Sequence, residues 1–326
     1  MELRIQNLSK TYANGVHALR DVTITIQPGM FGLLGPNGAG KSTLMRTIAT
    51  LQEPDTGSVT LGESDPSPNG SGQARSGTTI DVIREKDRVR RTLGYLPQEF
   101  GVYPGISAER LLHHFAVLEG FTDRRERQRV VEGLLRQTNL WDVRRERLGG
   151  YSGGMRQRFG IAVALLGGPS LIIVDEPTAG LDPAERVRFL NLLSEIGEQA
   201  VVILSTHIVE DVAELCSRMA IIDKGEILLE AEPAAAIGAL RGRVWTRVVA
   251  KAELPAIEQR HKVICTKLLG GRTLVHVYAE SSPGHEFERV EPDLEDVYFS
   301  VMAGHHPSTS SGQGPLATAG AIGAGR

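Results

Sequence analysis

One run of eight residues has the composition and spacing of a phosphate-binding loop. Residues 35–42 fit the pattern G-x-x-x-x-G-K-[ST], directly after an apolar run at 30–34 and before a helical run at 43–50. Glycines allow backbone N–H groups to converge on phosphate oxygens, and the helix that follows presents its positive N-terminus to the anion. The pattern assigns Lys41 to the β- and γ-phosphates and the Ser42 hydroxyl to Mg²⁺. The residues that we expect to hold the nucleotide are Gly35, Pro36, Asn37, Gly38, Ala39, Gly40, Lys41, Ser42 and Thr43.

A second chemical feature is a pair of carboxylates at the end of an apolar strand. Residues 171–174 read Leu-Ile-Ile-Val, and Asp175 and Glu176 follow them. Side chains alternate along a strand, so the two acids need not share one role. We expect Asp175 to hold the Mg²⁺ shell and Glu176 to polarise the attacking water as general base. Strands that leave a core commonly end in charged residues, so this pair alone is weak evidence for a site. Its functional interpretation depends on the presence of the phosphate loop.

These groups must be positioned by short apolar strands that alternate with helical periodicity. Three strands are expected at 30–34, 171–174 and 200–204, and each is followed at once by polar or glycine-rich residues. Short, nearly all-apolar strands are typical of a buried parallel sheet, whose ligands lie beyond the C-terminal strand ends. Residues 1–235 are therefore expected to form one α/β nucleotide-binding domain.

With these features in order, the chain resembles the ATP-binding subunit of an ABC transporter. The resemblance covers residues 1 to about 235, and it is carried by further short motifs as well as by the phosphate loop. Those motifs are Tyr12 in KTYANG, Gln98 in YLPQ, Ser152-Gly153-Gly154, Asp182 in AGLD and His207 in STH. The resemblance implies a P-loop NTPase of the ABC ATPase type, which combines a mostly parallel core sheet with an antiparallel β subdomain and a helical subdomain.

Residue roles follow from this resemblance. Tyr12 matches the aromatic residue that stacks on adenine, and Gln98 matches the glutamine that senses Mg²⁺ and faces the membrane subunit. His207 matches the histidine that touches the γ-phosphate, so the expected catalytic set is Lys41, Gln98, Glu176 and His207. Asp182 matches the loop that crosses the dimer interface and joins the expected nucleotide-binding residues. The expected metal ligands are Ser42, Gln98 and Asp175.

Ser152, Gly153 and Gly154 match the centre of the family's signature loop. Ser152 is a good N-cap for the helical run that follows, which makes the loop a second anion site in the same chain. In this family it binds the γ-phosphate that is held by the other subunit. The usual motif is Leu-Ser-Gly-Gly-Gln, whereas Tyr151 and Met155 stand at its ends here. Tyr-Ser-Gly-Gly-Met resembles the branch that works with ABC-2-type permeases, including drug and polysaccharide exporters.

The resemblance therefore implies an ATPase that powers translocation, in the direction of export, by a separate membrane permease. Expected cofactors are ATP and Mg²⁺, and expected partners are a second nucleotide-binding subunit and an ABC-2-type permease, without nucleic acid. The expected location is the cytoplasm, peripheral on the inner face of the cell membrane. The alternative is a soluble ABC ATPase that acts on ribosomes or DNA. Such proteins usually carry two nucleotide domains or a long coiled coil, and neither pattern occurs here. A binder without turnover is disfavoured by the presence of Glu176 and His207.

The composition also argues against several classes of protein function and structure. The chain of 326 residues has a net charge of −3 and only 5% aromatic residues, which argues against nucleic-acid binding. Its longest apolar stretches, such as 161–166 and 200–204, fall far short of the ~18 residues that span a bilayer. Two cysteines, Cys216 and Cys265, predict neither a disulfide framework nor a metal cluster.

Three segments lie outside the nucleotide-binding pattern. Residues 63–79 and 304–326 are rich in Gly, Ser, Pro and Ala and are expected to be a disordered insertion and a disordered tail. Residues 243–302 are expected to form a small C-terminal α+β domain, with alternating strands at 243–249 and 272–277. Leu294, Val297, Tyr298 and Val301 occur at the spacing of one helix face, after an acidic first turn. This segment shows no recognisable chemistry.

Overall fold

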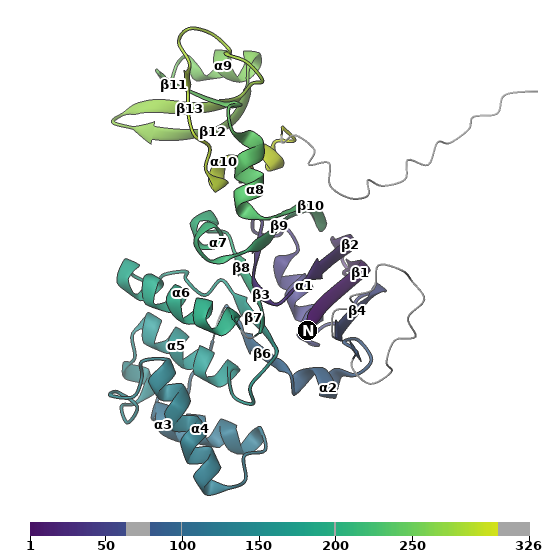
Figure 1. Cartoon of the computed structure of the whole chain (residues 1–326), viewed down its shortest axis with the longest axis vertical. Helices are drawn as coiled ribbons and strands as arrows, with labels where there is room; N and C mark the ends of the chain where they lie inside the picture. Colours follow the sequence, from purple (N-terminus) through teal and green to yellow (C-terminus); the bar gives the residue numbers. More distant parts are fainter. Residues whose placement is uncertain (63–78, 99, 199, 306–326) are drawn as a thin grey trace, which may run out of the picture.

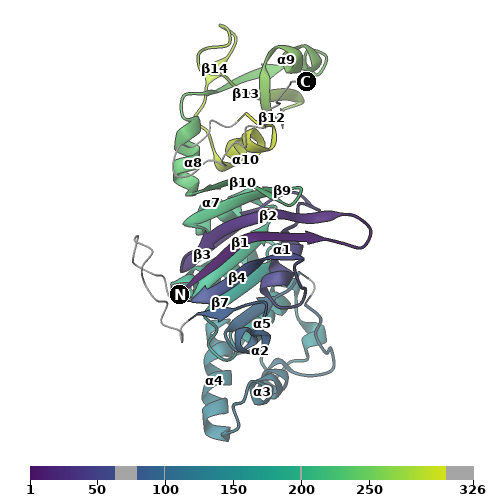
Figure 2. The same ribbon diagram turned by 90° about the vertical axis from the view of Figure 1, so that its right-hand side faces the viewer.

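Three β-sheets and the helices around them make up the fold in a computed structural model of the chain, which describes residues 1–62, 79–98, 100–198 and 200–305 (Figures 1 and 2). The predicted insertion at 63–79 and tail at 304–326 lie almost wholly outside the described residues. Among the described helices, none combines the length and the apolar character that a membrane span requires.

A six-stranded sheet forms the centre of the nucleotide-binding part. Its order is β10-β9-β3-β8-β7-β6, with bounds Glu226–Ala231, Arg218–Asp223, Gly29–Leu34, Val201–Thr206, Leu171–Asp175 and Leu93–Leu96. The five strands from β9 to β6 are parallel, and only the edge strand β10 is antiparallel. Every residue of β7 and β8 is buried, as expected for strands covered on both faces. The three predicted strands are confirmed as β3, β7 and β8, and their carboxyl ends lie side by side.

A second sheet is antiparallel and packs with helix α1 (Lys41–Ile48) on one face of the central sheet. Its order is β2-β1-β4-β5, with bounds His17–Ile26, Glu2–Thr11, Thr56–Gly62 and Ile80–Asp81. Apolar side chains of both sheets and of α1 form one buried cluster, which includes Ile5, Leu61, Met45 and Ile203. Short helix α2 (Lys86–Arg90) precedes β6. This packing holds the start of α1 against the ends of the parallel strands.

Helices cover the other face and extend away from it. Helices α6 (Pro183–Gly197) and α7 (Val209–Leu215) pack on the central sheet. Helices α3 (Ala108–Leu118), α4 (Arg124–Gln137) and α5 (Gly153–Ala164) build a separate helical cluster, seen at the bottom of Figure 1. The 3₁₀ helix η1 (Leu148–Gly150) leads into α5. The mostly parallel sheet, the antiparallel sheet and the helical cluster together are the fold class that the sequence predicted.

The C-terminal residues form a third sheet joined to the nucleotide-binding part by two helices. Its order is β12-β13-β11-β14, with bounds Lys262–Leu269, Arg272–Tyr278, Val244–Val249 and Glu288–Arg289. Helix α9 (Leu254–Arg260) packs on this sheet, whereas α8 (Pro233–Leu240) and α10 (Leu294–Met302) stand between it and β9–β10 (Figures 1 and 2). The predicted helix face is largely buried, in the same apolar cluster as residues of α6 and α7. The division into domains 1–235 and 243–302 stays our proposal.

A buried polar network ties the loop after β7 to helices α6 and α7. Asp211 on α7 is fully buried, and its carboxylate accepts hydrogen bonds from the Thr178 hydroxyl at 2.5 Å and from Arg186 Nε on α6 at 2.7 Å. Because a buried carboxylate is stable only when its oxygens are paired, Asp211 keeps these three segments in one arrangement. That arrangement positions the chain immediately after the carboxylates of β7.

We expect Asp211→Ala to lower the free energy of unfolding by about 3 kcal/mol, because it leaves the Arg186 guanidinium and the Thr178 hydroxyl without their acceptor. Urea unfolding followed by circular dichroism measures this change. Glu210→Ala, at the exposed neighbouring position, is the control and should change stability by less than about 0.5 kcal/mol. Equal effects of the two substitutions would contradict the structural role of Asp211.

Candidate functional site

The phosphate loop and the neighbouring strand ends enclose a cavity of about 270 Å³. Its walls come from the hairpin of β1 and β2, from the loop before α1 and the first residues of α1, and from two positions elsewhere in the chain. The residues that line it are Tyr12, Val16, Ala18, Pro36, Asn37, Gly38, Gly40, Lys41, Ser42, Thr43, Gln98 and Glu176. The structure therefore brings together most of the predicted nucleotide-binding residues. Sequence reasoning missed Val16 and Ala18, which follow Tyr12 in the same hairpin.

Lys41 lines this cavity and is 5% exposed. Its ammonium donates hydrogen bonds to the carbonyl of Gly35 and to that of Pro36, the latter at 3.2 Å, and lies 3.8 Å from Glu176 Oε1. Burial lowers the pKa of Lys41, and the carboxylates of Glu176 and Asp175 act in the opposite direction. The loop thus holds the ammonium in place by its own carbonyls.

Backbone geometry explains the glycines of this loop. Gly40 precedes α1 with φ at +110°, and a Cβ at this position would lie 2.5 Å from the Ala18 carbonyl oxygen. A Cβ at Gly35 would lie 2.3 Å from the carbonyl oxygen of Ile222. Both backbones therefore approach neighbouring strands too closely for any other residue. In the described structure no side chain caps the N-terminus of α1, so its N–H groups are available to an anion.

Asp175 ends β7 and offers a buried carboxylate oxygen beside the cavity. Burial raises the pKa of the Asp175 carboxyl, while the Ser205 and Ser42 hydroxyls and the Lys41 ammonium lower it. Its Oδ1 atom has no hydrogen-bond partner among the described residues. A buried, unpartnered carboxylate oxygen next to a serine hydroxyl fits a hard cation that prefers oxygen ligands, such as Mg²⁺.

Glu176 contacts both Lys41 and His207 at the edge of the cavity. Its Oε1 faces Lys41, and its Oε2 lies 2.5 Å from Nδ1 of His207, the residue directly after β8. The backbone of Glu176 adopts a φ of +50°, which is uncommon for a residue with a side chain, and its N–H donates to the Ser205 carbonyl at 2.8 Å. The carboxylate is buried, whereas the His207 side chain is 52% exposed. Glu176 and His207 thus meet at one sheet edge although 31 residues separate them.

Tyr12 and Gln98 complete the cavity from two sides. The Tyr12 hydroxyl donates to Gln52 Oε1 at 2.9 Å and lies 3.1 Å from Thr43 Oγ1, which anchors the tyrosine to the start and end of the α1 region. Gln98 is exposed and also lines a neighbouring depression with Phe100, Gly101, Gly153, Arg156 and Gln157. That depression lies beside the start of α5, so Gln98 stands between the cavity and the helical cluster.

Comparison with known proteins agrees with this arrangement. Residues 19–179 match the protein family described as ABC transporter. Over 232 residues the chain is 34% identical to the uncharacterized ABC transporter ATP-binding protein YxlF of Bacillus subtilis (strain 168), and the match covers 71% of this chain and 70% of that protein. The chain belongs to the ABC transporter family. It is an ATP-binding and ATP-hydrolysing subunit of such a transporter.

Two further matches extend the comparison. The daunorubicin/doxorubicin resistance ATP-binding protein DrrA of Streptomyces peucetius is 30% identical over 283 residues, which cover 86% of this chain and 78% of that protein. A solved structure described as a dimeric post-hydrolysis state of the ATP-binding cassette MJ0796, bound to ADP and Pi, superposes with a TM-score of 0.59 at 25% identity. This second match covers 71% of this chain and 98% of the solved one.

The signature loop of this ABC ATPase lies outside the nucleotide cavity of its own chain. Ser152 caps α5, where its Oγ accepts a hydrogen bond from the Met155 N–H at 3.1 Å. Ser152, Gly153 and Gly154 are absent from the described residues that line the nucleotide cavity. Tyr151, which replaces the usual leucine, is buried in the helical cluster, and its hydroxyl donates to the Val143 carbonyl. The unusual residue thus serves packing and leaves the serine and glycines in place.

Asp182 also lies outside the nucleotide cavity of the ABC ATPase. It is exposed, and its carboxylate caps α6 by accepting a hydrogen bond from the Glu185 N–H at 2.9 Å. Glu185 in turn lies 3.3 Å from the buried Arg158 on α5. Helices α5 and α6 are therefore held together next to the signature loop.

The two signature glycines differ in what surrounds them, so we expect different effects of substitution. A Cβ at Gly154 would lie 3.0 Å from Glu185 Cβ and 2.5 Å from its Oε2, whereas a Cβ at Gly153 meets no atom of the described residues within 4 Å. Gly154→Ala should lower the free energy of unfolding by about 1–2 kcal/mol through overpacking, and Gly153→Ala should not lower it. Thermal unfolding of both variants measures the contrast. Equal stability of the two variants would show that the α5–α6 contact is looser than described.

Proposed function

We propose that this chain drives the export of a substrate through a separate membrane permease, by closing on ATP as a dimer and reopening after hydrolysis. The observation that carries this proposal is the Glu176 carboxylate, which faces Lys41 with one oxygen and His207 with the other at the edge of a cavity lined by the phosphate loop. A buried base beside a γ-phosphate anchor supports hydrolysis as well as binding.

In this proposal Lys41 and the N–H groups before α1 bind the phosphates of ATP, and Tyr12 stacks on the adenine. Glu176 orients a water molecule for attack on the γ-phosphorus and takes up its proton, while the bond to the ADP oxygen breaks. His207 contacts the γ-phosphate, and its hydrogen bond with Glu176 holds the carboxylate in position. Entry of the phosphates gives the Lys41 ammonium new anionic partners in place of the loop carbonyls.

We propose Ser42, Asp175 and Gln98 as the groups that would hold Mg²⁺. The unpartnered Asp175 oxygen and the nearby Ser42 hydroxyl support this assignment. When bound, Mg²⁺ neutralises charge on the β- and γ-phosphates. Gln98 is exposed at the cavity wall, where its position can report on the nucleotide to the neighbouring helical cluster.

The position of the signature loop supports an ATP site that is shared by two chains. Ser152 to Gly154 lie outside the cavity that contains Lys41, which supports a second chain as their source at the same ATP. Two chains related by a two-fold axis satisfy this condition for both nucleotides, with Asp182 near the interface. ATP then holds the dimer closed through its γ-phosphate, and hydrolysis shifts the population towards the open state.

The proposals for the membrane partner and for the direction of transport rest on the similarity to known relatives. DrrA, whose match spans most of this chain, carries the name of a drug-resistance ATP-binding protein. We therefore propose an ABC-2-type permease as the membrane partner and a peripheral location on the inner face of the membrane, where ATP is available. We propose no nucleic-acid partner, which the net charge of −3 supports.

Glu176→Gln should retain ATP binding and accumulate a closed dimer, because glutamine keeps the hydrogen bonding of the carboxylate but not its basicity. Its ATPase rate should fall at least ~100-fold. Lys41→Ala should instead weaken ATP binding itself. Phosphate release, nucleotide binding and gel filtration with ATP separate the two defects. A Glu176→Gln rate near that of wild type would remove Glu176 as the base.

Mixing two inactive variants tests the shared site. Ser152→Arg should bind ATP through its own Lys41 but fail to dimerise with itself and to hydrolyse ATP. In a heterodimer with Glu176→Gln, one site lacks both its base and the partner's serine, and the other site is intact. The mixture should therefore recover ATPase activity that neither variant shows alone. A mixture that stays inactive while heterodimers form would contradict independent shared sites, and full activity in a strict monomer would reject the dimer altogether.

A further inference from the structure

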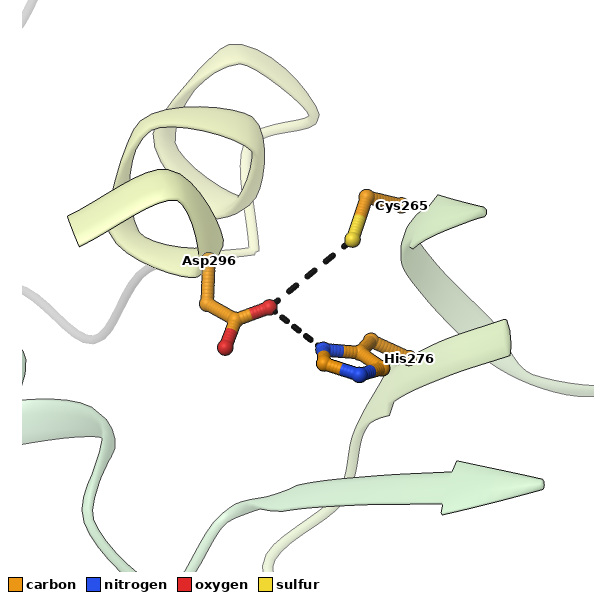
Figure 3. Close-up of side chains that lie close together, drawn as sticks. All are labelled: Cys265, His276 and Asp296. Carbon is orange, nitrogen blue, oxygen red and sulfur yellow. Dashed lines mark hydrogen bonds and ion pairs between the residues drawn. The ribbon is translucent and has the colours of Figure 1, made fainter. Parts of the chain in front are cut away.

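The C-terminal part of the chain contains a cluster of three side chains, two buried and one partly buried, that the proposed ATPase mechanism does not use. Cys265 on β12 and His276 on β13 are paired neighbours in the sheet, and Asp296 on α10 lies across them (Figure 3). His276 Nδ1 lies 2.7 Å from Asp296 Oδ1, and the Cys265 thiol donates to the same oxygen at 3.8 Å. His276 is 6% exposed and Asp296 is fully buried. One potential ligand atom from each residue lies within 4.8 Å of the other two.

We propose that Cys265, His276 and Asp296 form a binding site for one divalent metal ion of the Zn²⁺ type. Sulfur, imidazole nitrogen and carboxylate oxygen are the three donor types that Zn²⁺ takes in proteins. Two atoms bound tetrahedrally to one Zn²⁺ lie about 3.3–3.6 Å apart, and the separations of 2.7 and 3.8 Å lie on either side of that range. Small side-chain movements therefore complete the geometry, and a water molecule fills the fourth position.

The cluster is held in place by contacts that a metal ion would not disturb. The second oxygen of Asp296 accepts a hydrogen bond from the Asp293 N–H, within a capping box at the start of α10. Lys267 on β12 lies 2.5 Å from Glu295 and 3.5 Å from Asp293, which ties the same helix end to the sheet. Because Asp296 Oδ1 is free of this capping role, it can exchange its two present partners for a shared ion.

The position of the cluster indicates what the ion would do. α10 is one of the two helices that lie between the C-terminal sheet and the nucleotide-binding part, where Leu294, Val297 and Val301 join the apolar cluster of α6 and α7. An ion shared by β12, β13 and α10 would fasten the helix to the sheet, so the C-terminal sheet and the ATPase would move as one body. The inferred role is structural and independent of ATP hydrolysis.

Cobalt titration of the full-length protein tests the site directly. After removal of metals with EDTA, Co²⁺ should give a sulfur-to-cobalt charge-transfer band that saturates at one ion per chain and that Zn²⁺ displaces. An ion in the nucleotide cavity gives no such band, because no sulfur is among the described residues that line that cavity. Cys216→Ala is the matched control, since Cys216 is a buried cysteine of the nucleotide-binding part and lies outside the cluster. It should keep the band, and Cys265→Ala should lose it.

Hydrogen exchange provides a second readout that needs no cysteine substitution. Zn²⁺ should slow exchange in α10 and in β12–β13 of the wild-type chain, and Asp296→Asn should lose this protection. Absence of the band in wild type at saturating Co²⁺, or its persistence in Cys265→Ala, would overturn the proposal. Slowed exchange confined to other elements would overturn it as well.

Discussion

The interaction on which the site depends is the meeting of one buried ammonium with two buried carboxylates. Lys41 lies 3.8 Å from Glu176, and Asp175 adjoins both. Removing any one of these charges from water costs several kcal/mol unless an opposite charge or hydrogen bonds replace the solvent. The loop carbonyls and His207 supply those hydrogen bonds. The strands must therefore end where these groups can meet, and the parallel sheet satisfies this requirement.

Two supporting contacts extend outwards from this charge cluster. Asp211 links the loop after Glu176 to α6, and Glu185 of α6 pairs with Arg158 of α5. These contacts link the loop after β7 to α6, and α6 to the helix that begins after Ser152. The arrangement gives the helical cluster a physical connection with the proposed ATP site.

In the C-terminal sheet, too, a buried carboxylate with hydrogen-bond partners connects a helix to its neighbours. α10 buries its apolar face against the nucleotide-binding part and turns Asp296 towards the C-terminal sheet. One helix therefore serves two interfaces, apolar on one side and polar on the other. The capping box at its start fixes the helix end, so the orientation of Asp296 relative to β12 and β13 is well defined.

The local motifs were predictable because each depends on interactions between residues that are close together in the sequence. A glycine-rich loop between a strand and a helix, two carboxylates after an apolar strand, and a serine before a helix each follow from neighbouring residues alone, and the strands β3, β7 and β8 lie where the sequence predicted them. The sequence also predicted the family.

Only the tertiary structure decided which of these distant residues meet. It placed His207 against Glu176. It also left Ser152 outside the cavity that contains Lys41, as the family resemblance implied. It also joined Cys265 to His276 and Asp296, in a segment whose sequence predicted no chemistry. The reason is that β12 alternates poorly and ends in two exposed leucines, so neither its existence nor its register could be deduced from periodicity. The cross-strand pairing that brings sulfur and imidazole together depends on that register, which packing sets and local sequence does not.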